Sequence, residues 1–293
     1  MLAPDISNYT GTLIGGWPAA LREHDNGLVI VQAVDPPPPY PPTHTWDQLN
    51  TLAAHAIPTD VYVWLYFIDD WHVDLKRRLA LLDGHTIRRI WIDVEENDSA
   101  LSGAAAGWTP ADRAGVIREA LGICDNAGEQ FGFSLLDTSG IYSAAWYWNN
   151  YLAGIDEFAD RPLWVVDWDG VAGENIWNQF GGWESYAIKQ YQGTTTYLGQ
   201  PNCDLNWVHP SEAERVLVYQ AFLNGEIAVV PAEDPCARYL TAIADVTKGD
   251  VYQTLRDELE RRNSYGRRLG LRKSIIERAV RRLEAVAAEF SPN

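Results

Sequence analysis

Two carboxylic acids stand two residues apart at the end of an apolar run near the middle of the chain. The run is Ile90 to Val94, and the acids are Asp93 and Glu95. Because side chains alternate along a β-strand, both acids would lie on one face, roughly 6.6 Å apart along the chain. Two carboxyl groups that share a site tend to split their pKa values, so that one stays protonated. This pair therefore predicts general acid catalysis of the kind that cleaves a glycosidic bond.

The segment alone has a simpler interpretation, because acids are common where a strand runs out into solvent. The case for a site depends on the elements that would position other acids beside these two. Apolar runs predict strands, and amphipathic runs predict helices, in alternation. The expected strands cover 3–9, 27–34, 61–67 and 88–95, and the expected helices cover 13–24, 46–57, 74–82 and 109–126. A fifth strand is expected at either 131–136 or 140–143.

The pattern changes after Pro162, where strands at 163–169, 186–192 and 203–207 follow one another without an amphipathic helix between them. We expect these three hairpin-like strands to close a barrel. The predicted fold class is α/β, a distorted TIM-like (β/α) barrel with a hairpin-closed C-terminal part and a C-terminal α-helical extension. Chemistry in such barrels sits at the C-terminal strand ends, and Asp5, Asp93, Glu95 and Asp204 fall at or near such ends.

Composition excludes some classes of partner. The net charge of −17 argues against nucleic acid and against simple electrostatic adhesion to an anionic membrane or cell wall. The 13 Trp and 14 Tyr are many, and sugar-binding clefts use such rings as apolar platforms. Three scattered cysteines (Cys124, Cys203 and Cys236) predict reduced, mostly buried thiols. We expect a soluble chain with no export signal and no membrane insertion.

Three regions are expected along the chain: a barrel over 1–208, a helix and linker over 209–237, and a helical tail over 238–293. The tail carries 12 basic and 8 acidic residues, whereas the first 237 residues have a net charge of −21. Its two amphipathic stretches are too short to be stable alone. We therefore expect the C-terminal helices to bind other protein chains, in a virion or a homo-oligomer.

Six short motifs, in this order and spacing, resemble the family 25 glycoside hydrolases, the lysozymes (muramidases) found in many bacteriophage endolysins. The resemblance spans about residues 3–208, and the family has an irregular barrel with five helix-linked strands and a hairpin end. The motifs are Asp5-Ile6-Ser7, Ile92-Asp93-Val94-Glu95, Gly140-Ile141-Tyr142-Ser143, Leu163-Trp164-Val165-Val166, Gln190-Tyr191 and Asp204-Leu205-Asn206.

The resemblance implies that Glu95 is the general acid and that Asp5, Asp93 and Asp204 surround the scissile bond. It leaves open whether a carboxylate or the substrate's N-acetyl group attacks the sugar. Without that resemblance, Asp5 would be interpreted as a residue that caps a helix or stabilises a turn, and Asp204 as the acid of an Asx-turn. The implied site uses no metal and no cofactor. The implied substrate-binding residues are Tyr9, Trp64, Tyr66, Tyr142, Trp168 and Gln190.

One departure from the family lies in the third strand, where Trp64-Leu65-Tyr66 replaces a Tyr-His-Phe-like sequence. By this alignment Leu65 stands where the family has a polar cleft residue. Trp168 replaces a smaller aromatic residue and would either stack on a sugar or pack in the barrel.

Two hypotheses of function follow. The first is a bacteriophage muramidase that binds the glycan strands of peptidoglycan and cleaves the β-1,4 bond after N-acetylmuramic acid. The second is a virion tail protein whose lysozyme-like barrel binds wall glycan with little or no catalysis. In either case we expect synthesis in the host cytoplasm and action from the virion tail or after release to the cell wall. A divalent-metal enzyme is a weaker third alternative, because no His stands near the acids in the sequence.

Overall fold

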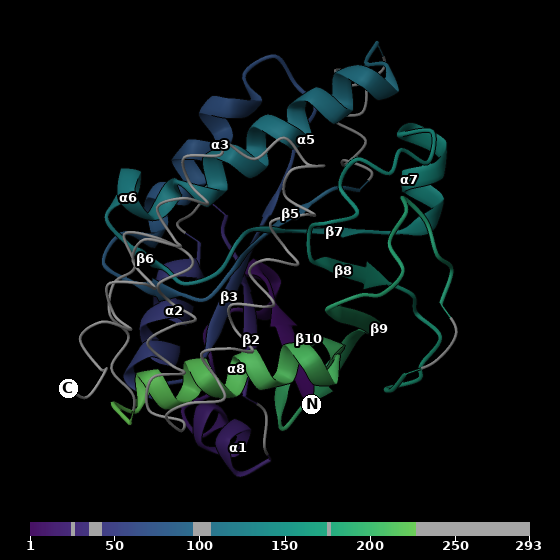
Figure 1. Ribbon diagram of the computed structural model, residues 1–293. Helices are drawn as coiled ribbons and strands as arrows, with labels where there is room; N and C mark the ends of the chain where they lie inside the picture. Colours follow the sequence, from purple (N-terminus) through teal and green to yellow (C-terminus); the bar gives the residue numbers. More distant parts are fainter. Residues whose placement is uncertain (25–26, 35–42, 96–106, 175–176, 227–293) are drawn as a thin grey trace, which may run out of the picture. The chain divides into compact units, whose positions relative to one another are not determined.

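The computed structural model describes residues 1–24, 27–34, 43–95, 107–174 and 177–226 (Figure 1). The chain divides into two compact units, Met1–Asn224 and Gly225–Asn293. Nearly all of the second unit, and with it Cys236 and the expected linker and tail over 227–293, lies outside the described residues. The description below therefore concerns the first unit.

Eight strands form a closed barrel in the order β1-β10-β9-β8-β7-β5-β3-β2, which confirms the predicted α/β barrel. Neighbouring strands are parallel except at β10, which is antiparallel to both β1 and β9. The strands are β1 (Leu2–Ile6), β2 (Val29–Gln32), β3 (Thr59–Trp64), β5 (Ile90–Asp93), β7 (Gly140–Ser143), β8 (Leu163–Val166), β9 (Ile188–Tyr197) and β10 (Gln200–Val208).

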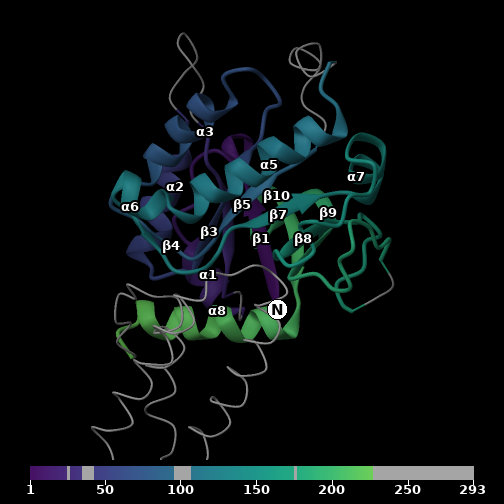
Figure 2. The ribbon, with the colours of Figure 1, turned by 45° about the horizontal axis from the view of Figure 1, so that its top comes forward.

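Helices follow the early strands and cover the outside of the barrel, as Figures 1 and 2 show for α2, α3 and α5. Local sequence explains the start of α5, because Thr109 caps the helix in a capping box with Asp112 and Pro110 occupies the first helical position. The helices are α1 (Trp17–Glu23), α2 (Thr45–Ala54), α3 (Trp71–Leu79), α5 (Pro110–Asp125), α6 (Ala127–Phe131), α7 (Ala145–Tyr151) and α8 (Pro210–Leu223), with 3-10 turns η1 (Asn8–Thr10) and η2 (Ala80–Leu82). No helix among the described residues is both long and apolar enough to cross a membrane.

Two details of the expected barrel differ in the structure. The three last strands are not all hairpin-like, because β8 and β9 run parallel and only β9 and β10 form a hairpin. Of the two alternatives for the fifth strand, β7 enters the barrel. The other segment contributes β6 (Ser134–Leu135), which pairs with β4 (Thr86–Ile87) in a separate two-stranded sheet.

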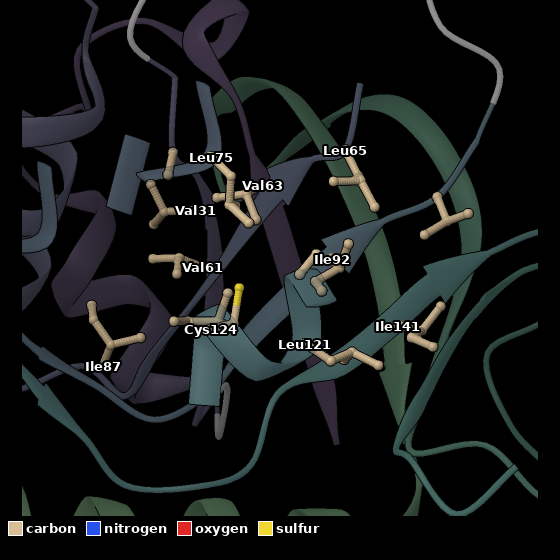
Figure 3. Packing of buried hydrophobic residues seen from close by; sticks show 14 of the residues in the cluster. Val31, Val61, Val63, Leu65, Leu75, Ile87, Ile92, Leu121, Cys124 and Ile141 are labelled. Carbon is tan, nitrogen blue, oxygen red and sulfur yellow. The ribbon is translucent and has the colours of Figure 1, made fainter. Parts of the chain in front are cut away.

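Alternating side chains along the strands build two apolar cores. The outer core lies between the barrel and its helices and includes Val63, Leu65, Ile92 and the thiol-bearing Cys124 (Figure 3). The inner core fills the barrel itself and includes Trp91, Trp164, Ile30, Ile188 and Val208. Cys124 and Cys203 are free and buried, as expected for a chain whose few cysteines are far apart in the sequence. Because the inner core is packed, the barrel interior is solid rather than a channel.

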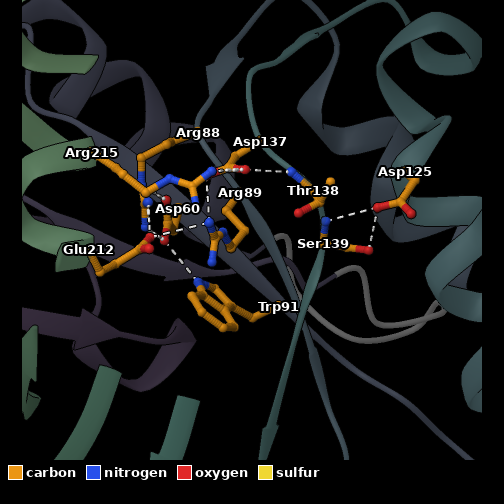
Figure 4. A network of polar contacts seen from close by, with 10 residues as sticks. All are labelled: Asp60, Arg88, Arg89, Trp91, Asp125, Asp137, Thr138, Ser139, Glu212 and Arg215. Atoms are coloured by element: carbon orange, nitrogen blue, oxygen red, sulfur yellow. Dashed lines mark hydrogen bonds and ion pairs between the residues drawn. The ribbon is translucent and has the colours of Figure 1, made fainter. Parts of the chain in front are cut away.

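A buried polar network closes the end of the barrel opposite the C-terminal ends of its parallel strands (Figure 4). The guanidinium of Arg88 donates to both carboxylate oxygens of Asp60, at 2.8 and 2.5 Å, and also to Glu212 of α8. Arg89 pairs with Asp137 at 2.5 Å. Asp60 and Arg89 are fully buried, so each charge depends on its partner to offset the loss of solvent. These contacts hold α8 across the base of the barrel.

Candidate active site

The four acids named from the sequence lie at the opposite, C-terminal end of the parallel strands. Asp5 of β1 faces Asp204 across the β1–β10 ladder. Asp93 is the last residue of β5, where it is the register partner of Trp64 on one side and Tyr142 on the other. Glu95 follows two residues later. Asp5 and Asp93 are buried, whereas Glu95 and Asp204 are partly exposed.

Burial and mutual repulsion raise the pKa values of these acids. Burial, followed by the charge of Asp204, raises the pKa of Glu95 to about 7. Burial and the charges of Asp204 and Glu95 also raise the pKa of Asp5 to about 7, against hydrogen bonds from Asn206 and Gln190 that favour its ionised form. A cluster with such pKa values holds protons at neutral pH that isolated carboxylic acids would lose.

Asp93 and Asp204 differ in the donors that reach them. The pKa of Asp93 is raised well above its usual value by burial and then by Glu95 and Asp5, and its buried Oδ1 has no hydrogen-bond partner among the described residues. The pKa of Asp204 is also raised by burial, but the backbone N–H of Thr194 donates to its carboxylate and opposes that rise. Negative charge is therefore better stabilised at Asp204 than at Asp93.

Gln190 of β9 connects the acids to two aromatic side chains. Its Nε2 donates to Asp5 Oδ2 at 2.9 Å and, more weakly, to Asp204 Oδ2 at 3.4 Å. Its Oε1 accepts from the Tyr142 hydroxyl at 3.0 Å and from the Trp168 indole N–H at 2.9 Å. All the bonding positions of the amide are used, and this fixes which end of Gln190 faces the acids. The structure thus brings together three of the expected substrate-binding residues.

Two residues quoted in the sequence motifs but given no role there also hold Asp5. Asn206 Nδ2 donates to Asp5 Oδ2 at 2.7 Å and to the carbonyl oxygen of Ala3 at 3.0 Å. The Trp164 indole N–H in turn donates to Asn206 Oδ1 at 2.7 Å. The sequence could have indicated the role of Asn206, because a residue two positions after Asp204 in a strand points to the same face as Asp204.

The loop after β8 holds the Trp168 ring in an accessible position. The side chain is 66% exposed, yet its N–H is bonded to Gln190 and its ring packs over Gly193, where an added Cβ would come within 3.2 Å. The same loop is anchored by an ion pair between the buried Lys189 ammonium and Asp169 at 2.7 Å. A flat ring that is fixed but exposed suits stacking against a sugar.

The aromatic residues at the end of β3 form a second group. Trp64 and Tyr66 stack with their ring centroids 6.0 Å apart, and the Arg78 guanidinium lies 4.5 Å from the centroid of the Tyr66 ring. Arg78 also opposes the rise in the pKa of Asp93, which places this group beside the acids. Tyr9 lies in η1, just after β1, and its side chain is 86% exposed.

Leu65 is not a cleft residue, contrary to the expectation from the sequence. Its side chain is 1% exposed and belongs to the outer core, between the barrel and the helices (Figure 3). Alternation along the chain explains the difference, because the register partner of Asp93 is Trp64 and the next residue must point outward. The departure at Leu65 therefore removes no polar group from the cleft.

Among the described residues, no group of three or more His, Cys, Asp or Glu side chains has the arrangement of a metal site. The acids instead form a cluster whose electrostatics suit proton transfer and the stabilisation of positive charge.

Comparison with known proteins finds similar sequences and similar folds among lysozymes and muramidases. No protein-family model matches the chain. A probable GH family 25 lysozyme of Dictyostelium discoideum is 29% identical over 164 residues, which cover 54% of this chain and 31% of that protein. The chain thus matches about a third of this relative's length. The chain is thus similar in sequence to probable GH family 25 lysozymes.

Solved structures show the same fold. A muramidase from Acremonium alcalophilum superposes with a TM-score of 0.55 at 17% identity, over 77% of this chain and 99% of that one. The catalytic domain of an endolysin from Listeria monocytogenes bacteriophage P40 superposes with a TM-score of 0.54 at 16% identity, over 74% and 96%. The chain has the barrel fold of the family 25 lysozymes.

Proposed function

We propose that the protein is a glycosidase that acts on peptidoglycan, specifically a muramidase that cleaves the β-1,4 bond after N-acetylmuramic acid. The observation that carries this proposal is the acid cluster at the C-terminal end of the barrel, in which the pKa of Glu95 is raised to about 7. The similarity to family 25 lysozymes in sequence and fold supports the same activity.

In the proposed reaction Glu95 is protonated when substrate binds and gives its proton to the oxygen of the leaving sugar. The bond to the anomeric carbon breaks as this proton is transferred, and positive charge develops on the ring that remains. Asp204, which keeps the donated N–H of Thr194, stabilises that charge as an anion. Gln190 and Asn206 hold the Asp5 carboxylate in place by donating hydrogen bonds to its Oδ2. Water then completes hydrolysis at the anomeric carbon, and Glu95 recovers its proton.

The binding-only alternative is not favoured, because a barrel that merely holds glycan does not need buried, destabilising acids. Two of the four acids, Asp5 and Asp204, accept hydrogen bonds that fix the orientation of their carboxylates. Asp93 is buried without a partner for Oδ1. Retaining that unpaired acid costs stability, which function explains and passive binding does not.

The test is to incubate the protein with purified peptidoglycan and to measure new reducing ends, followed by mass spectrometry of the products. We expect fragments with N-acetylmuramic acid at the reducing end. Glu95→Gln is the inactive control. Fragments that end in N-acetylglucosamine would contradict the bond assignment, and an absence of reducing ends would contradict the enzymatic function.

We also propose that the protein is a bacteriophage product, made in the host cytoplasm and acting from the virion tail or at the cell wall. The resemblance in fold to a phage endolysin is consistent with this origin. The net charge of +4 over 238–293, set against −21 for the preceding residues, supports docking of that region to another protein chain. Comparing the solution mass of the whole chain with that of a chain cut after Gly225 tests the docking, and mass spectrometry of purified virions tests the location.

A further inference from the structure

A hollow on the flank of the barrel has none of the four acids in its lining. It is a cavity of about 990 Å³ between α7, the segment before β9 and His209 after β10. Pockets that hold small ligands span about 300–1,000 Å³, so this one has room for more than a single sugar ring. Its lining includes Trp146, Asn149, Trp177, Gln179, Tyr186 and His209.

Packed aromatic rings support one part of the lining, because Trp177 of the lining packs edge-on against Phe180. Phe180 in turn contacts Trp148 and Trp183, whose ring centroids lie 4.9 Å apart. The Trp148 indole N–H donates to the carbonyl oxygen of Ile155 at 2.9 Å. Gly181 makes this packing possible, because its φ is +55° and a Cβ there would come within 2.7 Å of Trp148 Nε1. A preformed wall reduces the ordering cost of binding a ligand.

The exposed part of the cavity combines an aromatic face with polar side chains. Trp146 on α7 is 49% exposed, and its ring is steadied by edge contacts with Tyr147 and Tyr151. Asn149 lies one turn further along the same helix and is exposed. Residues three apart on a helix share a face, so an indole ring and an amide point toward the same ligand.

His209 adds an imidazole ring to the lining of the cavity. Its Nδ1 lies 2.8 Å from the Ser211 hydroxyl, and its Nε2 lies 3.8 Å from Glu174 Oε1. Glu174 and Glu184 also line the cavity, so its charge does not favour an anionic ligand. An aromatic face with amide donors, carboxylate acceptors and no excess positive charge matches a neutral, N-acetylated sugar chain.

We propose that this flank cavity is a second glycan-binding site, which holds a neighbouring glycan strand while the acid cluster cleaves another. The proposal rests on the proposed glycosidase function. The chain connects the two sites, because Ala145 of the cavity lining comes two residues after β7, whose Tyr142 donates a hydrogen bond to Gln190 of the acid site. A second contact would raise the effective concentration of a polymeric substrate without changing the cleavage of a short one.

The test compares Trp146→Ala with Trp46→Ala. Trp46 is a matched control, since it is 48% exposed and lies in α2, on the opposite side of the barrel from α7 (Figures 1 and 2). Reducing ends are measured on insoluble peptidoglycan and on a soluble tetrasaccharide from it. In parallel, each substitution is combined with Glu95→Gln, and co-sedimentation with insoluble peptidoglycan gives the bound fraction without cleavage.

We expect Trp146→Ala to lower turnover of the insoluble polymer and to weaken co-sedimentation by about threefold to tenfold, with the tetrasaccharide unaffected. Trp46→Ala should match the parent protein in every assay. Equal co-sedimentation of the two variants, or an equal loss on both substrates with Trp146→Ala, would overturn the second site. If the parent protein cleaves neither substrate, the proposed activity fails, and co-sedimentation alone still decides whether the flank cavity binds glycan.

Discussion

Asp5 and Asp204 face each other across the β1–β10 ladder, and one nitrogen, Gln190 Nε2, donates to both of their carboxylates. The two acids therefore share a donor, and neither can ionise without affecting the other. This coupling, and the proximity of Glu95, makes the protonation of the site a property of the group.

Glu95→Gln should reduce glycan cleavage by about 100-fold to 10,000-fold, because the amide keeps the shape of the side chain but has no proton to transfer. The midpoint of thermal unfolding should not fall. Glu129→Gln is the matched control, since Glu129 is an exposed glutamate of α6. A large loss of thermal stability in Glu95→Gln would mark Glu95 as a structural residue.

The value of kcat/KM should fall as the pH rises above about 7, because Glu95 of the substrate-free enzyme loses its proton there. This fall is the alkaline limb of the pH profile. Asp204→Asn removes the neighbouring charge that disfavours the Glu95 anion, so the pKa of Glu95 should fall and the limb should move to lower pH. Titration of the Glu95 carboxyl group by NMR measures this shift even where the variant turns over slowly. A limb that stays in place would show that burial alone sets the pKa.

Asp5→Asn should stabilise the fold, and more so at about pH 8 than at about pH 4. The folded-state pKa of Asp5 is about 7, above that of an unfolded aspartic acid, so the folded protein binds the extra proton between these values. The free energy of unfolding of the parent protein, which has Asp5, therefore falls as the pH rises through about 7. Unfolding by denaturant at the two pH values measures the difference, and equal effects at both would contradict a raised pKa.

Trp168→Ala should raise KM by about threefold to tenfold, because it removes the exposed ring expected to stack on the sugar. Trp168→Phe keeps an aromatic face but loses the hydrogen bond to Gln190, so it separates the two contributions. We expect its KM to stay near that of the parent protein. If both variants lose activity equally, Trp168 acts by positioning Gln190 and not by stacking.

Arg88→Ala should lower the free energy of unfolding by about 3–5 kcal/mol, because Asp60 would remain buried without its ion-pair partner. Arg118→Ala is the matched comparison, since Arg118 pairs with Glu157 at the exposed surface and should contribute at most about 1 kcal/mol. Denaturant unfolding measures both. Similar losses in the two variants would show that the network in Figure 4 contributes no more than a surface pair.

Much of the barrel could be predicted from the sequence because a strand buried on both faces, such as β2, is a continuous apolar run. The direction of a strand leaves no such trace, and this is why β8 was wrongly expected to be part of a hairpin. Arg88 and Arg89 could not be recognised as buried, because the acids that pair with them come from distant segments.

The candidate site follows the same division. Asp93 and Glu95 could be found because they end an apolar run, whereas Asp5 and Asp204 were placed by the family resemblance. The role of Asn206 depends on the alignment of β10 beside β1. Leu65 was assigned to the cleft because aligning a motif does not determine which face of the strand a residue occupies.

The reversed direction of β10 decides where the chain leaves the barrel. A strand parallel to β1 would have ended near Asp5 and Ile6, and the next helix would have begun at the end of the barrel that carries the acids. Instead β10 ends at the base, where His209 leads directly into α8 and Glu212 meets Arg88. One antiparallel strand thus places the start of α8 at the end of the barrel far from the acids, where it completes the ion-pair network of Arg88.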